Sequence, residues 1–122
     1  MTTTFADFAA ECDAKNTIHL NIIKYCYELI DTLKSNHAER FNNLGVEFEI
    51  ESGKKYHKIV MISSGDARSV HCFVDKKTGD VYKSASWKAP AKGVRFNLLL
   101  IKDREWLMQY ADAFGSYLYR RG

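Results

Sequence analysis

Cysteine and proline are scarce in this chain, and it has no long apolar run. Its 122 residues include one proline, while 46% of them are hydrophobic, a composition that excludes collagen-like and disordered chains. The three cysteines, an odd number at wide spacing, fit no disulfide framework and predict reduced thiols in the cytoplasm. No stretch approaches the roughly 20 apolar residues that a membrane-spanning helix needs, and Met1 to Phe8 lack the pattern of a secretion signal. We therefore expect no membrane partner.

The length predicts one domain. A chain of 122 residues buries roughly two thirds of its unfolded surface, which is enough for a core without disulfides or bound metal. We therefore interpret residues 1–122 as a single α+β domain.

Charge is divided unevenly along the chain. Residues 1–52 contain nine acids and four bases, a net charge of −5, whereas residues 53–122 contain six acids and fourteen bases, a net charge of +8. This asymmetry favours polyanionic partners or head-to-tail self-association, and hence a homo-oligomer. Lysines that merely solvate exposed hairpins would produce the same count, so both interpretations stay open.

The first third of the chain is typical of helix. Thr4 and Asp7 resemble a capping box, which predicts a helix that begins at residue 4 or 5. From Thr17 to a point between Ser35 and His37, apolar residues recur at steps of three and four, the pattern of an amphipathic helix. The members of this stripe are Ile18, Ile22, Cys26, Leu29, Ile30 and Leu33.

The middle of the chain is typical of an antiparallel sheet. Residues 46–51 alternate without a fault, so one face of this strand carries Val46, Phe48 and Ile50 inward and the other carries three glutamates. We expect these glutamates to face Lys54, Lys55 and Lys58 of the next strand. Turn signals then separate three more strands, predicted at residues 56–63, 69–75 and 80–87.

The C-terminal third predicts a helix and a further strand. Asp103 is the expected N-cap of a helix that buries Trp106, Leu107, Tyr110 and Phe114 and ends at Gly115. Residues 116–121 are a candidate fifth strand. The predicted fold is therefore a two-layer α+β domain, in which an antiparallel four-stranded meander packs against an N-terminal and a C-terminal helix.

One segment concentrates unusual residues. Between Ser84 and Asn97 the chain gathers three cations, two aromatic rings and the single proline. Cations neutralise phosphates, and an exposed ring stacks on a base for roughly 1–3 kcal/mol, so this segment is a candidate site for a nucleic-acid strand. The predicted site residues are Trp87, Lys88, Lys92, Arg95 and Phe96. The alternative is a structural brace, in which Trp87 closes the core and the cations are solvated.

No motif in the chain indicates an enzyme. It has no phosphate-binding glycine loop and no nucleophile-elbow motif. His71 and Cys72 are neighbours in a predicted strand, so their side chains should point to opposite faces and form no nucleophile–base pair. His19 and Cys26 supply at most two metal ligands, and the turn from Asp75 to Asp80 lacks the ligand set of a calcium loop. We therefore expect no catalytic residue, no metal and no cofactor.

The second half of the chain resembles a set of small bacteriophage proteins. The similarity rests on the run Val70–Asp75, the hairpin Lys77–Lys83 and the loop Trp87–Asn97, which reads W-K-A-P-A-K-G-V-R-F-N. The ending Asp112–Tyr119 is similar in character. The resemblance implies a viral origin and the cytoplasm of an infected host cell, and it implies no activity.

Two classes of function follow from these observations. The first is a non-enzymatic phage accessory protein that binds nucleic acid, single-stranded in form, through the segment at 87–97. The second is a protein-interaction module, either an inhibitor of a host factor or defence, or a small virion or assembly component, with a host or phage protein as partner. A small-ligand pocket between helix and sheet is a third alternative.

Overall fold

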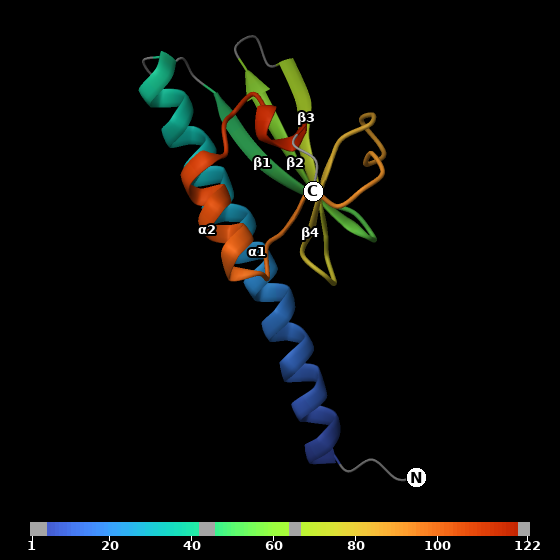
Figure 1. The fold of residues 1–122 in the computed structure, drawn as a ribbon. Helices are drawn as coiled ribbons and strands as arrows, with labels where there is room; N and C mark the ends of the chain where they lie inside the picture. The colour runs from blue at the N-terminus through green and yellow to red at the C-terminus, as the bar shows by residue number, and fades with distance from the viewer. Residues whose placement is uncertain (1–4, 42–45, 64–66, 120–122) are drawn as a thin grey trace.

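The computed structural model describes residues 5–41, 46–63 and 67–119, and the side chains of residues 17–38 within the first range. Within these described residues, two α-helices, five strands and one 3₁₀ helix follow one another. Figure 1 shows them as a sheet with both α-helices on one side. In order, they are α1 (Phe5–Phe41), β1 (Glu47–Ser52), β2 (Tyr56–Ser63), β3 (Ala67–Asp75), β4 (Asp80–Lys83), β5 (Phe96–Asn97), α2 (Ile101–Tyr110) and η2 (Ser116–Tyr119).

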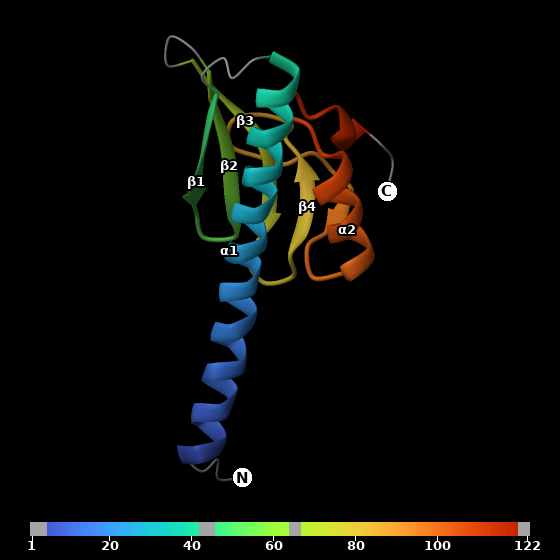
Figure 2. The same ribbon diagram turned by 90° about the vertical axis from the view of Figure 1, so that its left-hand side faces the viewer.

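Helix α1 is a single helix of 37 residues. The sequence analysis predicted helix in two stretches, and they join because no proline or glycine interrupts residues 5–41. Most of the predicted stripe is buried, but Ile18 is 42% exposed because α1 runs beyond the sheet at this end (Figures 1 and 2). The buried members are Ile22, Cys26, Leu29, Ile30 and Leu33. No helix in the described part of the chain is long and apolar enough to span a membrane.

The sheet is an antiparallel meander in the order β1-β2-β3-β4-β5. The predicted α+β fold is confirmed, and so is the alternation of β1, whose Phe48 and Ile50 pack toward the core while Glu47 and Glu49 are exposed. Both helices lie against this inner face of the sheet, and no helix of the described residues covers the outer face (Figures 1 and 2). The side chains of the strands and loops therefore form the surface of the outer face in the described part of the chain.

The fifth strand is not the one that the sequence analysis predicted. Strand β5 pairs with β4 through Val81↔Phe96 and Asp80↔Asn97. Asn97 fixes this position with its side-chain amide, which donates to the Thr78 carbonyl oxygen at 2.9 Å and to Asp80 Oδ1 at 2.6 Å. The predicted fourth strand is correspondingly shorter and ends at Lys83.

A β-bulge interrupts β3. Ile59 pairs with Cys72 and Val60 with Val70, so His71 is an extra residue without a partner on β2. A bulge of this kind turns two successive side chains toward the same face. The prediction that His71 and Cys72 point to opposite faces was therefore wrong, and both residues are buried on the inner side of the sheet.

The C-terminal helix begins earlier and ends earlier than the sequence indicated. Helix α2 begins at Ile101, and Leu100 occupies the N-cap without a side-chain hydrogen bond. Asp103 is not the N-cap, because its carboxylate accepts a hydrogen bond from the Asn97 backbone N–H at 2.7 Å. The helix ends at Tyr110, so Phe114 lies outside it and is 61% exposed.

The predicted C-terminal strand was also wrong. Residues 116–119 form the 3₁₀ helix η2, which follows Gly115 at φ 75°. Tyr117 and Leu118 are adjacent and both buried, which a half-buried strand does not allow because its neighbouring side chains point to opposite faces. A helical turn brings both of them onto the core.

The burial of the α1 stripe predicts the cost of truncating it. We expect Leu29→Ala, at a fully buried position, to lower the free energy of unfolding by about 2–5 kcal/mol, because it removes apolar contacts and leaves a cavity. Leu20→Ala, the same change at a 66% exposed position of the same helix, should change it by less than about 0.5 kcal/mol. Urea unfolding followed by circular dichroism measures both values, and equal losses would contradict the packing described here.

Candidate nucleic-acid interface

The segment between β4 and β5 folds into an ordered loop, residues 84–95. Ser84 forms an isolated bridge with Pro90, and the Ala91 N–H donates to the Lys83 carbonyl oxygen at 2.7 Å. At the tip, the Ser86 hydroxyl oxygen accepts from the backbone N–H groups of Lys88 and Ala89 at 3.3 and 3.2 Å. The loop therefore presents Trp87 and Lys88 from a backbone that its own hydrogen bonds hold in place.

Two of the predicted site residues lie inward. Phe96 is 8% exposed and stacks on Trp106 at a ring-centroid distance of 5.1 Å, so its face is covered by the core. The Arg95 guanidinium donates from Nε to the Leu118 carbonyl oxygen at 2.8 Å and from an Nη to the Gly93 carbonyl oxygen at 2.9 Å. Gly93 adopts φ 95°, and a Cβ atom there would lie 2.9 Å from this Nη. The hydrogen bonds of Arg95 thus connect the loop to η2.

The other three predicted residues lie at the surface. Trp87, Lys88 and Lys92 are all exposed, and Trp87 retains 42% of its accessible surface. The Lys58 ammonium sits 4.2 Å from the centroid of the Trp87 ring, a cation–π contact that joins the loop to β2. Trp87 therefore lies over the outer face of the sheet.

The outer face holds aromatic residues that the sequence analysis did not select. Tyr56 on β2 packs edge-on against Phe73 on β3 and Tyr82 on β4, with ring centroids 5.7 and 5.9 Å apart. Phe73 is directly opposite both Lys58 and Tyr82 in the register, so these side chains share one face. The Lys55 ammonium lies 5.4 Å from the Tyr56 centroid. The sequence signal that could have identified these residues is the two-residue period of the strands, because it separates side chains on the outer face from side chains in the core.

A recess of about 320 Å³ opens on this outer face between the β1–β2 turn and the loop 84–95. Four lysines contribute to its lining, together with one glutamate and two aromatic rings. We call it the basic recess; its charged and aromatic members are Lys54, Lys55, Lys58, Lys88, Glu51, Tyr56 and Phe73.

The negative charge beside the basic recess is already paired. Glu51 forms ion pairs with Lys58 at 3.9 Å and with Arg68 at 2.9 Å, and Arg68 also bonds Glu49. Hydrogen bonds to these two carboxylates raise the pKa of the Arg68 guanidinium. Of the lysines expected to pair with the β1 glutamates, Lys58 does so, whereas Lys54 and Lys55 form no ion pair within the described residues. The recess therefore keeps net positive charge at its rim.

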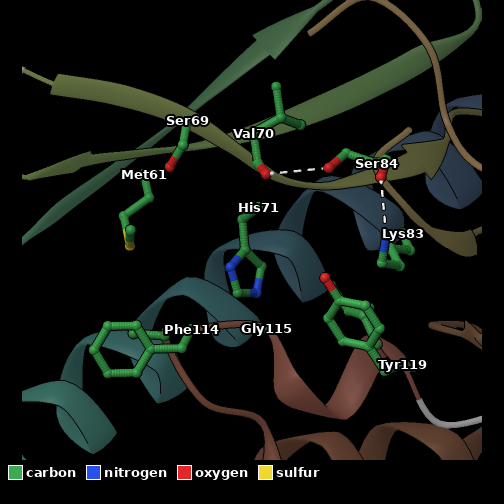
Figure 3. A pocket seen from close by; sticks show the side chains of 11 residues that line it. Met61, Ser69, Val70, His71, Lys83, Ser84, Phe114, Gly115 and Tyr119 are labelled. Carbon is green, nitrogen blue, oxygen red and sulfur yellow. Dashed lines mark hydrogen bonds between the residues drawn. The ribbon is translucent and has the colours of Figure 1, made fainter. Parts of the chain in front are cut away.

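A second hollow, of about 160 Å³, lies on the inner side of the sheet next to His71 (Figure 3). In Figure 3 the His71 ring points toward Phe114 and Gly115, and Lys83 lies beside Tyr119. His71 Nε2 and the Tyr117 hydroxyl form a hydrogen bond of 2.6 Å. Burial lowers the pKa of His71 to about 4, against smaller opposing effects of Asp112 and the Ala113 backbone, so the ring is neutral at neutral pH. His71 thereby links the bulge to η2.

Neither of the two described thiols, Cys26 and Cys72, is an activated nucleophile. Burial raises the pKa of Cys26 to about 12 and that of Cys72 well above the usual value of a thiol, so both stay protonated at neutral pH. Although the bulge turns His71 and Cys72 to the same side, the hydrogen bond of the imidazole described above goes to Tyr117. Among the described residues, no group of three or more histidine, cysteine or acidic side chains is placed to hold a metal ion.

The fold and the surface define a class: an α+β protein with a five-stranded antiparallel meander, two helices on the inner face and a recess lined by lysines and aromatic rings on the outer face. Within this class, the chain belongs to the Family of unknown function (DUF7717), whose model matches residues 5–120. No curated protein and no solved structure matches the chain significantly.

The buried imidazole predicts a pH-dependent stability. A histidine whose pKa falls from 6.5 in the unfolded chain to about 4 in the fold binds its proton first in the unfolded state. We therefore expect stability to decrease by up to roughly 3 kcal/mol as the pH falls from 6.5 to 4. His57, whose pKa burial also lowers, adds to this dependence in the same direction.

The variant His71→Gln isolates the share of His71, because an amide keeps hydrogen-bonding capacity without titrating. Its free energy of unfolding, measured in urea between pH 4 and 7, should depend on pH less steeply than that of the parent protein. The reference is the parent protein measured under the same conditions, because His57 keeps its own pH dependence in both proteins. An unchanged slope in His71→Gln would refute the assignment.

Proposed function

We propose that this protein binds single-stranded nucleic acid on the outer face of its sheet, through the basic recess and the adjoining Trp87. The observation that carries the proposal is the gathering of four lysines beside the exposed Trp87 and the half-buried Tyr56, on a face that no helix of the described residues covers. Phe73 is 2% exposed and lies beneath these side chains. Antiparallel sheets with aromatic rings and cations on an open face are a recurrent platform for unpaired bases.

Each part of the surface has a role in this proposal. Lys54, Lys55 and Lys88 line the basic recess and would neutralise phosphates of a strand that passes through it. Trp87 is the ring with the largest exposure on this face and would stack on a base. Stacking on its face requires an unpaired base, which is why we propose a single strand. Arg95 and Phe96 leave the proposed contact set, because the first holds the loop and the second fills the core.

The biological setting in this proposal comes from the sequence resemblance. The runs at Val70–Asp75 and Trp87–Asn97 are similar to those of small bacteriophage proteins. We propose accordingly a non-enzymatic phage accessory protein that acts in the cytoplasm of an infected host cell. The family model supports a shared domain over residues 5–120 and leaves the source of the family open.

The lysines of the recess predict a salt-dependent affinity. We expect the triple change Lys54→Gln, Lys55→Gln, Lys88→Gln to weaken binding of a labelled oligothymidylate roughly tenfold at about 50 mM salt. The slope of log affinity against log salt should decrease in magnitude by about 2, since each lost phosphate contact contributes about 0.7 on a single strand. Fluorescence anisotropy at several salt concentrations measures both quantities.

The matched control removes charge from α1 at Lys24→Gln and Lys34→Gln, two exposed lysines, and is compared with the recess pair Lys54→Gln, Lys88→Gln. It should keep both affinity and slope close to the parent values. If the control pair and the recess pair lose affinity equally, attraction is diffuse and the basic recess is not the site. If the parent protein does not bind at about 50 mM salt, the proposed function is wrong.

Trp87 predicts a spectroscopic signature. The chain has two tryptophans, and Trp106 is stacked on Phe96 at the core, so a base that stacks on Trp87 should quench the exposed fraction of the emission. We expect Trp87→Ala to lower affinity about tenfold or more, and Trp87→Phe to retain most of the affinity while losing the quenching. Quenching that persists in Trp87→Phe would place the contact elsewhere.

The protein-interaction module remains a second candidate function. It is favoured by large apolar side chains that are exposed on and near the helices, among them Leu20, Tyr27, Leu100 and Ile101. In this alternative the protein would inhibit a host factor or defence, or belong to a virion or its assembly. A partner recovered equally with and without nuclease treatment would favour this candidate over nucleic-acid binding.

A further inference from the structure

Helix α1 extends well past the rest of the molecule. Its 37 residues correspond to about 55 Å at a rise of 1.5 Å per residue. Among the described side chains of α1, the first buried one is Ile22, and both ribbon views show the N-terminal part of α1 running away from the sheet with no other element beside it (Figures 1 and 2). Most of the stability of a helix in a protein comes from packing of one of its faces, so a helical projection with no element beside it is a candidate for contact with a partner.

The contacts between α1 and α2 show where such a partner would lie. The Arg104 guanidinium carbon is 4.0 Å from the Tyr25 ring centroid, and the Thr32 hydroxyl donates to Met108 Sδ at 3.2 Å. The two helices therefore run in the same direction, side by side. Ile18 precedes Tyr25 by seven residues, as Tyr25 precedes Thr32, so all three lie along one line of α1. At Ile18 the line has passed beyond the first residue of α2.

Apolar side chains remain exposed at this point. Ile18 is 42% exposed, and the residues at the beginning of α2 are exposed as well, Leu100 at 57% and Ile101 at 63%. Figure 1 shows the first turn of α2 beside α1, where α1 leaves the sheet. We call this group the junction patch: Ile18, Leu99, Leu100 and Ile101. It continues the α1–α2 interface without any covering element among the described residues.

We propose that the junction patch and the projecting part of α1 form a dimer interface with a second copy of this chain, in which the two α1 helices run antiparallel. The partner's helix would then occupy the line that α2 leaves open and would end on the junction patch. A two-fold axis makes this arrangement self-complementary, because each chain supplies both a projecting helix and a patch.

Length and charge favour a second copy as the occupant. The projecting part of α1, residues 5–20, is about 24 Å long, so an antiparallel copy brings the N-terminus of one helix to the point where the other helix meets the sheet. The sequence of residues 5–16 contains three acids and one lysine, and the first turn of α2 contributes the exposed Lys102 beside the patch. The acidic end of each helix would thus approach a base of the other chain.

Sedimentation velocity of the full chain tests this proposal. We expect the parent protein to sediment as a dimer of twice 14.0 kDa, 28.0 kDa, at micromolar concentration. Ile18→Glu and Ile101→Glu, each made separately, should raise the dimer dissociation constant by about tenfold or more, because each would bury an unpaired carboxylate in the interface. The matched control is Val94→Glu, which is 41% exposed, lies in the loop 84–95 and should leave the dimer intact.

The outcomes separate clearly. A monomeric parent protein at 100 µM or more would overturn the proposal, and so would a dimer that survives both patch variants. Circular dichroism checks that each variant folds, and the two changes lie on different elements, so failure of one to fold leaves the other as the test. Dissociation by Val94→Glu alone would overturn the proposal and assign the interface to the loop 84–95.

Discussion

The burial of the α1 stripe against one face of the meander is the constraint on which the rest of the structure depends. Ile22, Cys26, Leu29 and Leu33 meet the inner residues of the strands and commit one face of the sheet to the core. Because side chains alternate along a strand, this choice also decides what the other face presents. Lys58, Phe73 and Tyr82 are thereby directed away from the helices, where the loop 84–95 joins them. The position of the proposed site therefore follows from which side chains of the strands pack against α1.

Most of the fold could be predicted from patterns among residues that are close in sequence. The alternation from Glu47 to Ser52 and the spacing of the α1 stripe each require only neighbours along the chain, and both features are present as expected. The features that the sequence analysis missed depend on distant partners. Nothing near His71 indicates a bulge, which exists only because β2 and β3 must keep their inner faces aligned across one extra residue. The pairing of Phe96 with Val81 likewise spans a loop whose conformation no local pattern determines.

The same distinction explains the candidate site. The segment at 87–97 attracted attention through its composition, but composition does not separate residues that hold a loop from residues that face water. Arg95 reaches the Leu118 carbonyl oxygen, 23 residues away, and Phe96 reaches Trp106, so both serve packing. Trp87 and Lys88 remain at the surface. Trp87 contacts Lys58, and Lys88 lines the same recess as Tyr56 and Lys55, which are remote in sequence. A surface assembled from separate strands can be located only when the register is known.

The two proposed surfaces lie on opposite sides of the sheet, and this arrangement gives the uneven charge of the chain a physical meaning. The acidic N-terminal part would pair with another copy on the helix side, while the basic recess stays open on the outer face. A dimer formed along α1 would therefore leave two basic recesses free, and a strand bound in one would meet the other at a raised effective concentration. If the acidic N-terminal part of α1 bound to the basic recess of the other chain instead, its carboxylates would compete with phosphates for the recess lysines. Because the two surfaces share no residue, each proposal can fail without the other.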